Sequence, residues 1–207
     1  MKKIITVTIT MLVCLGTAEV KALILDDGGV HTIDYQLDDN VWVEDSTLDE
    51  FTTLNIVDGG IIRDWVNVFG YSQVNMAGGS IGSGFLTWDN SYSVISDGLI
   101  ETGLDTFNES EVFVFGGIIT GGLNIQDSSQ VTISGTNFAI NGFPVNYGTY
   151  TASDYISGIL TGTLSNGDLI NNEFGIANNA SITLVPEPTT LLLIGVGVLC
   201  LRRRNWM

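Results

Sequence analysis

Cysteine is scarce in this sequence, with only two residues of that type among 207, at Cys14 and Cys200. Both lie in apolar stretches at the two ends of the chain. The long middle therefore has no disulfide and no thiol nucleophile. This excludes a disulfide-rich domain and a cysteine-based enzyme in that region.

Positive charge is also scarce, because 7 residues are Lys or Arg while 23 are Asp or Glu. Between Leu23 and Val185 the single cation is Arg63. Nucleic-acid binding requires clustered Lys and Arg against the phosphates, so nucleic acid is excluded as a partner. Divalent cations and neutral or cationic polymers are compatible with so acidic a body.

Residues suited to catalysis are few. His31 is the only histidine, and with no second His or Cys beside it we interpret it as a surface residue rather than a metal ligand or general base. No G-x-S-x-G or metal-binding motif is present. A lyase acting on uronates needs Lys, Arg or His to neutralise the carboxylate and take a proton. The two such residues in the body, Arg63 and His31, do not occupy corresponding positions of the repeat. We therefore expect no catalytic residue, no metal site and no enzyme activity.

The chain does contain a repeat with a period of 19 residues, from about Thr53 to Phe138. Several positions recur in one register, and they are Gly60, Gly79, Gly98 and Gly117; Ile62, Ile81, Ile100, Ile119 and Phe138; Val57, Met76, Ile95, Val114 and Ile133; Thr53, Ser72, Ser91, Ser110 and Ser129; and Val66, Phe85, Leu104 and Leu123. A fixed period of this length is typical of repeat architectures, in which each unit buries its apolar face against the next.

The repeat unit consists of short β-rich runs separated by glycine turns, with no helical spacing. Strands at a constant count predict an all-β fold, a parallel β-solenoid of about five coils, with each column stacked at the ~4.8 Å strand spacing. Glycine suits the corners, where the chain needs positive φ or a close approach between coils. The alternative is an antiparallel sandwich with evenly spaced turns.

The repeat occupies residues 53–140, and one further β segment is expected on each side of it. Residues 23–52 alternate apolar side chains with many Asp, which predicts a β cap over the open end of the stack. After residue 140 the register fails, and residues 141–185 are expected to form a β closure at the C-terminal end.

One aromatic column, formed by Phe69, Trp88 and Phe107, lies next to a column of Asp and Asn. We expect a structural stack that stabilises neighbouring coils. The alternative, in which these three residues contact a glycan, stays open. Asp58, Asp97 and Asp127 near the turns carry oxygen ligands of the kind that Ca²⁺ binds, but no run has the loop spacing that this ion requires. We therefore expect no cofactor.

Residues 1–22 are expected to be a secretory signal peptide with a helical apolar run. Lys2 and Lys3 precede that run, which extends from Ile4 to Leu15. A small-residue cleavage site ends at Ala22, with a site ending at Ala18 as the alternative. The apolar run is too short to span a membrane comfortably.

The last 22 residues, 186–207, carry the most specific pattern. Pro186, Glu187 and Pro188 precede an uncharged stretch, 189–201, and then a basic cluster formed by Arg202, Arg203 and Arg204. The prolines keep the triad extended, and the arginines fix the orientation of the apolar helix by staying cytoplasmic. Thirteen residues at ~1.5 Å span only ~20 Å of the ~30 Å hydrocarbon core, so we expect a weak, transient anchor in the inner membrane.

An N-terminal signal combined with V-P-E-P, an apolar helix and an arginine cluster resembles the PEP-CTERM sorting signal of exopolysaccharide-producing bacteria. The resemblance covers only the ends of the chain. It implies that exosortase, a membrane protease, recognises Pro186, Glu187 and Pro188, and that the arginines retain the tail until cleavage. The implied destination is the cell surface or the extracellular space.

The body has two candidate functions. The first is a structural or adhesive protein of an exopolysaccharide matrix or biofilm layer. The alternative is a polysaccharide-degrading enzyme on a β-helix, either a lyase or a hydrolase. A hydrolase requires two carboxylates at a defined separation, and so many Asp and Glu leave that alternative open.

Overall fold

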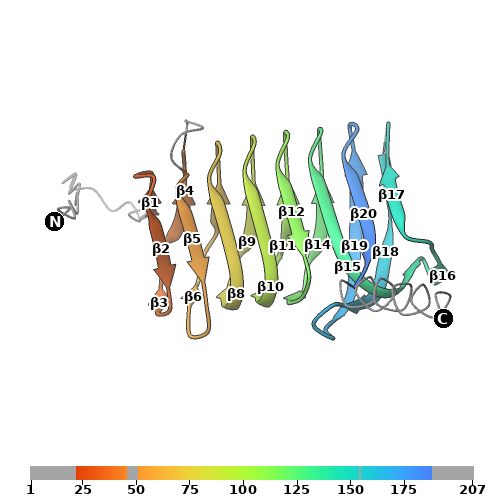
Figure 1. Cartoon of the computed structure of the whole chain (residues 1–207), viewed down its shortest axis with the longest axis horizontal. Helices are drawn as coiled ribbons and strands as arrows, with labels where there is room; N and C mark the ends of the chain where they lie inside the picture. The colour runs from red at the N-terminus through yellow and green to blue at the C-terminus, as the bar shows by residue number, and fades with distance from the viewer. Residues whose placement is uncertain (1–21, 46–50, 154, 188–207) are drawn as a thin grey trace, which may run out of the picture.

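The computed structural model describes residues 22–45, 51–153 and 155–187, and every regular element among them is a β-strand. These strands, β1 to β20, form one hydrogen-bonded sheet. Successive coils of the sheet lie side by side along the long axis of the molecule (Figure 1). The predicted parallel β-solenoid is confirmed, and the antiparallel sandwich is wrong. The predicted terminal helices lie outside the described residues.

Three rows of strands form the faces of the coil. Face A contains β2 (Val30–Ile33), β5 (Thr53–Ile56), β8 (Gln73–Ile81), β10 (Tyr92–Ile100), β12 (Glu111–Val114), β15 (Gln130–Ile140) and β20 (Ser181–Pro186). Face B contains β3 (Gln36–Leu37), β6 (Ile61–Ile62), the ends of β8 and β10, and β13 (Ile118–Ile119). Face C contains β1 (Ala22–Leu25), β4 (Asn40–Val43), β7 (Val66–Val68), β9 (Gly84–Thr87), β11 (Gly103–Thr106), β14 (Gly122–Ile125) and β19 (Leu169–Ala177). Neighbours within each face pair in parallel.

The core consists of apolar rows that run along the axis. Ile62 pairs with Ile81, Ile81 with Ile100, and Ile100 with Ile119. All four side chains are buried, with at most 9% exposed. Burying each such side chain contributes roughly 1.5–3 kcal/mol. The predicted row of Val66, Phe85, Leu104 and Leu123 is buried and paired in the same way.

The register of the coil that begins with β5 differs from the prediction by one residue. Thr53 pairs with Gln73 and Ile56 with Met76, although Ile62 pairs with Ile81 as expected. The turn between β5 and β6 therefore holds one residue more than the later turns. Placing Thr53 and Val57 in the repeating columns was wrong, and their neighbours Thr52 and Ile56, both fully buried, occupy those places.

Glycine forms the corners between faces A and B, as expected. Gly79, Gly98 and Gly117 have φ values of 72°, 108° and 90°. A Cβ on Gly79 would lie 2.4 Å from the carbonyl oxygen of Gly60, in the coil beside it. Both the left-handed backbone and the close approach between coils therefore require glycine here.

The described part of residues 23–52, which was predicted to form a β cap, supplies β2 to β4 and all of β1 except Ala22. Face A begins with the pairing of β2 to β5, and face C with the pairing of β1 to β4. This segment is thus the first coil of the stack. Among the described residues, no strand pairs with the outer edge of β1, β2 or β3.

At the other end the coil gives way to antiparallel pairing. From Gly135 onward β15 pairs with β18 (Tyr155–Leu164), and β18 pairs along its length with β19. Phe138 is buried there, but no strand pairing places it beside Ile119, so its predicted place in the isoleucine row was wrong. A short strand, β16 (Phe143–Pro144), pairs with the end of β15, and β17 (Gly148–Thr151) covers β20. Figure 1 shows β17 beyond β20 at this end.

No helix in the described ranges is long and apolar enough to cross a membrane.

Candidate binding groove and sorting segment

The sorting triad continues directly from the last parallel strand. Pro186 is the final residue of β20, and its partner in the sheet is Gly135 of β15. The Ser134 hydroxyl donates to the Pro186 carbonyl oxygen over 3.4 Å. Glu187 follows immediately, while Pro188 and the predicted retention cluster Arg202, Arg203 and Arg204 lie outside the described residues. No linker therefore separates the folded body from the first residue of the triad.

The predicted signal cleavage site also adjoins the fold. Ala22 is the first residue of β1 and pairs with Asn40 of β4. The remainder of the predicted signal peptide lies outside the described residues. Cleavage after Ala22 would leave Leu23–Leu25 to form the strand.

The aromatic column forms a stack at the corner that follows face C. The ring centroids of Phe69 and Trp88 are 6.2 Å apart, and those of Trp88 and Phe107 are 3.9 Å apart, with interplanar angles of 14° and 12°. Trp42 contacts Phe69 edge-on. The three stacked rings are half-buried and cover one another's faces. This is the arrangement expected of a structural stack, and glycan contact by these residues stays a prediction.

The next column along the chain, of Asp and Asn residues, forms the turn at the same corner. Asp89, Asn108 and Asp127 have φ values of 58°, 59° and 61°, a left-handed conformation that Asn and Asp tolerate best after glycine. The Asn108 amide donates to Asp89 Oδ1 over 2.9 Å, and the Gly70 N–H donates to Asp89 Oδ2 over 3.1 Å. These side chains therefore bind the next coil.

The three residues considered as Ca²⁺ ligands, Asp58, Asp97 and Asp127, make separate contacts. Asp97 accepts a hydrogen bond from the Gly98 N–H over 2.7 Å, and Asp127 accepts one from the Asn108 N–H. Asp58 lies against Gly78. Within the described ranges, no group of three or more His, Cys, Asp or Glu side chains has a geometry that could hold a metal ion.

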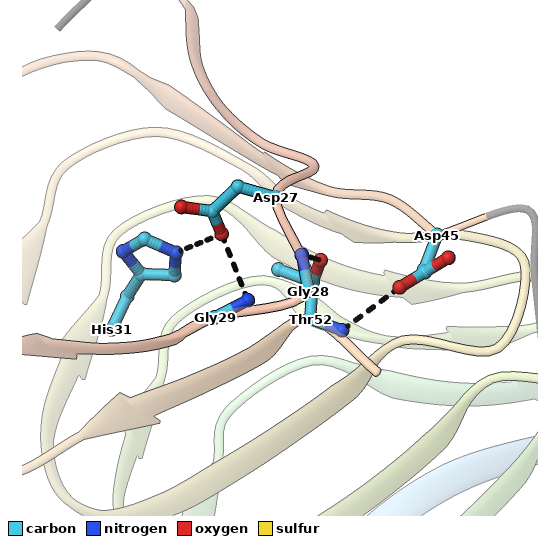
Figure 2. A network of polar contacts seen from close by, with 6 residues as sticks. All are labelled: Asp27, Gly28, Gly29, His31, Asp45 and Thr52. Carbon is cyan, nitrogen blue, oxygen red and sulfur yellow. Dashed lines mark hydrogen bonds and ion pairs between the residues drawn. The ribbon is translucent and has the colours of Figure 1, made fainter. Parts of the chain in front are cut away.

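His31 is part of a turn network in the first coil (Figure 2). Its Nε2 lies 2.7 Å from Asp27 Oδ1, which also accepts from the Gly29 N–H over 2.9 Å. These hydrogen bonds, first from His31 and then from Gly29, hold the pKa of Asp27 below its usual value. The Gly28 N–H donates to the Thr52 hydroxyl, which ties the turn to the next coil. The network accounts for His31 without a ligand.

A groove crosses the outer surface of face C, and a row of glycines forms part of its floor. Gly84, Gly103 and Gly122 pair directly with one another on β9, β11 and β14. Their positions lie next to buried Phe85, Leu104 and Leu123, so the side chains of any larger residues would stand on this surface. Over Gly103 and Gly122 the absence of side chains leaves the space of the groove open.

An aromatic side chain lies across a glycine at each end of this surface. A Cβ on Gly84 would come within 2.3 Å of the Trp65 ring, so the indole covers that glycine. A Cβ on Gly175 of β19 would come within 2.8 Å of the Tyr155 hydroxyl. Trp65 remains 37% exposed and Tyr155 65% exposed. The strands that carry these two glycines, β9 and β19, are three strand spacings, or about 14 Å, apart.

Polar groups line the same groove. Asp105 and Asn124 pair through the register of β11 and β14, and Glu173 is exposed on β19. Burial raises the pKa of Asp105 above its usual value of 3.8, and a hydrogen bond with Asn124 opposes the rise. Half-burying a carboxylate costs free energy, and such groups in clefts are candidate functional groups.

The groove has a volume of about 590 Å³, within the range of small-molecule sites. It presents aromatic rings, hydroxyl and amide groups, and two carboxylates, Asp105 and Glu173. Chemically this set can stack against a ring and exchange hydrogen bonds with many hydroxyl groups. No Lys or Arg belongs to the described residues that line it.

The groove was not predicted from the sequence, although part of it is visible there as a repeating column. Trp65, Gly84, Gly103 and Gly122 are successive members of one 19-residue column. Tyr155 and Glu173 lie beyond the repeat, and only the antiparallel pairing of β18 with β19 brings them to the same surface. No pattern in the sequence connects them with Trp65.

Comparison with known proteins identifies the C-terminal segment. Residues 184–204 match the family model for the PEP-CTERM protein-sorting motif. The motif marks an exported protein that is processed by exosortase, a membrane protease, as the resemblance implied. No curated protein and no solved structure matches the chain.

Proposed function

We propose that this protein is a structural or adhesive component of an exopolysaccharide or biofilm layer, released to that layer when exosortase removes its C-terminal tail. One observation supports the proposal most directly, the continuity of β20 with the sorting triad at Pro186. Because no linker intervenes, the end of the rod that carries β20 adjoins the membrane while the tail is uncut. The product of cleavage is then a rigid acidic rod with almost no residual tail.

The architecture supports a structural role. Each coil is hydrogen-bonded to its neighbours through three rows of strands. Every interface between coils therefore adds to the stability of the rod. We propose further that the tail anchors the protein transiently in the inner membrane. After cleavage the protein resides at the cell surface or outside the cell.

The test follows the chain in cells that make exosortase and exopolysaccharide. Glu187→Ala removes the only charge of the triad, and Glu111→Ala removes an exposed carboxylate on face A as the control. We expect intact-mass measurement to show loss of both predicted terminal segments in wild type and Glu111→Ala. Glu187→Ala should keep its tail and accumulate in the membrane fraction.

The matrix role is tested separately, by comparing the surface-associated amount in strains with and without the polysaccharide. We expect the protein to move to the medium when the polysaccharide is missing. Equal retention in both strains would contradict the matrix role while leaving the processing step intact.

A second candidate function, hydrolysis of a polysaccharide, is favoured by one observation: Asp105 and Glu173 line the same groove. Paired carboxylates at a suitable separation are what glycoside hydrolysis requires. Release of shortened products from a polysaccharide, abolished in both Asp105→Asn and Glu173→Gln, would establish this function. Binding without product release would favour the matrix role.

A further inference from the structure

We infer that the groove on face C is a binding site for a neutral glycan segment, seated over the glycine row between Trp65 and Tyr155. The inference rests on the proposed function, because it names the kind of polymer that the exported rod would contact. It assigns the contact to face C rather than to the stack of Phe69, Trp88 and Phe107.

The shape of the groove suits an extended chain of rings. The glycines of β9, β11 and β14 follow one another at the strand spacing, which gives a narrow trough along the rod axis. About 14 Å separates β9 and β19, the strands whose glycines Trp65 and Tyr155 cover. A trough of this length and a volume of about 590 Å³ can hold a short oligosaccharide within a longer polymer.

The aromatic groups supply apolar contact. Trp65 and Tyr155 combine a large apolar surface with an N–H or O–H group at the edge, and both are partly exposed. Pyranose rings carry C–H groups on their faces and hydroxyls around their edges. They can therefore pack against an aromatic side chain and hydrogen-bond beside it. Two such side chains at opposite ends would hold two rings of one chain.

The polar groups determine the class of glycan. Asp105, Asn124 and Glu173 offer acceptors and an amide donor, which match sugar hydroxyls. Uronate or sulfated sugars would bring negative charge against Asp105 and Glu173 with no Lys or Arg in the described lining to compensate. The site therefore favours neutral sugars over acidic ones.

Gly122 provides a way to fill the groove without disturbing the fold. It is exposed, and the nearest atom to a Cβ there would be the Glu173 carbonyl oxygen at 3.4 Å, an ordinary contact. Gly122→Gln would therefore place a side chain in the trough. Trp65→Ala removes one aromatic end, and Tyr92→Ala on face A is its matched control, since both aromatic side chains are 37% exposed.

The experiment is calorimetric titration of the full chain, held in a mild detergent, with a panel of hexasaccharides. The neutral probes are cellohexaose, laminarihexaose and maltohexaose, and the acidic probe is hexagalacturonate. We expect at least one neutral probe to bind. Gly122→Gln, which fills the trough, and Trp65→Ala, which removes an aromatic contact, should each weaken binding about tenfold or more, while Tyr92→Ala stays within about twofold.

Three results would overturn the inference: no binding of any neutral probe, tighter binding of the galacturonate, or full affinity in Gly122→Gln. Circular dichroism checks the fold of each variant, and Gly122→Gln decides the matter if Trp65→Ala is destabilised. Failure of these titrations leaves processing and surface retention untouched, because those are measured in cells. Failure of retention with intact glycan binding would instead contradict the proposed function alone.

Discussion

At the scale of single residues, the buried hydroxyl row shows how similar side chains in successive coils have different partners. Ser129 Oγ lies 2.8 Å from Thr106 Oγ1 and donates to the Gln126 carbonyl oxygen over 2.6 Å. Ser91 Oγ, two coils earlier, is buried with no hydrogen-bond partner in the described structure. A satisfied hydroxyl stabilises the fold, whereas a buried unsatisfied one costs free energy.

This difference predicts opposite effects of one substitution at two equivalent sites. Ser129→Ala should lower the free energy of unfolding by about 1 kcal/mol, because it also leaves the Thr106 hydroxyl without that partner. Ser91→Ala should be neutral or stabilising. Urea unfolding of both variants checks this, and an equal loss at the two sites would contradict the hydrogen-bond assignment.

Asp105 allows a prediction about pH. Burial raises the pKa of Asp105 in the folded state above 3.8, its usual value. Between 3.8 and the folded pKa, the folded state therefore binds more protons than the unfolded state. Stability therefore falls as pH rises through that window, and the cost persists at neutral pH. Asp105→Asn should raise Tm at pH 7 and have little effect below pH 3.8. A lower Tm for the variant at pH 7 would show that the carboxylate is stabilising.

At the scale of elements, the pairing makes each coil a separable unit. Tyr92 and Glu111 are register partners, so deletion of residues 92–110 joins Ser91 to Glu111 at an equivalent position. The neighbours β8 and β12 then meet with the same faces inward. The chain loses one coil and keeps its core rows.

We expect the deletion of residues 92–110 to leave a folded, shorter solenoid with a smaller urea m-value, because less surface is exposed on unfolding. The matched control deletes residues 94–111, one residue fewer than a coil, and joins Ser93 to Val112 inside the strand, so that Val112 and Val114 take outward positions. Circular dichroism and urea unfolding compare the two. Equal stability of both deletions would contradict the coil as the structural unit.

The elements also show what the sequence could predict. Columns at a strict 19-residue period identified the parallel coils and the buried rows of Ile62 and Phe85, because stacked coils repeat their environment. The first hydroxyl member was misplaced by one residue, since the turn before β6 holds an extra residue that leaves no mark on the composition. The length of a turn depends on its backbone conformation, and the types of residue in a repeating column do not determine that conformation.

The groove was beyond prediction for a different reason. Its glycine row was visible as a column, but glycine at a regular interval predicts corners as readily as an open surface. Its other end depends on β18 reversing direction against β15 and β19 after the repeat has ended. Such a reversal is set by tertiary pairing between segments that share no register.

At the scale of the whole molecule, the rod carries almost uncompensated negative charge. Arg63 lies 3.0 Å from Asp38, but both side chains are more than half exposed, at 63% and 66%, so this ion pair adds little stability. The fold is held by the axial core rows and the hydrogen bonds between coils. Surface charge instead keeps the rods soluble and repels acidic polymers.

All of these features depend on residues one period apart lying side by side in parallel coils, and cysteine pairs test this most directly. With Cys14 and Cys200 replaced by serine, Tyr92→Cys with Glu111→Cys places two thiols on exposed register partners. Their Cα atoms are about 4.8 Å apart, within disulfide range. Tyr92→Cys with Gln130→Cys spans two coils, about 9.6 Å, which is too far.

The measurement is the loss of free thiols under mild oxidation, followed by intact mass. We expect the pair at positions 92 and 111 to form an intramolecular disulfide in the folded protein, and the pair at 92 and 130 to stay reduced. Cross-linking of both pairs to the same extent, or of the second pair alone, would contradict the stacked parallel coils.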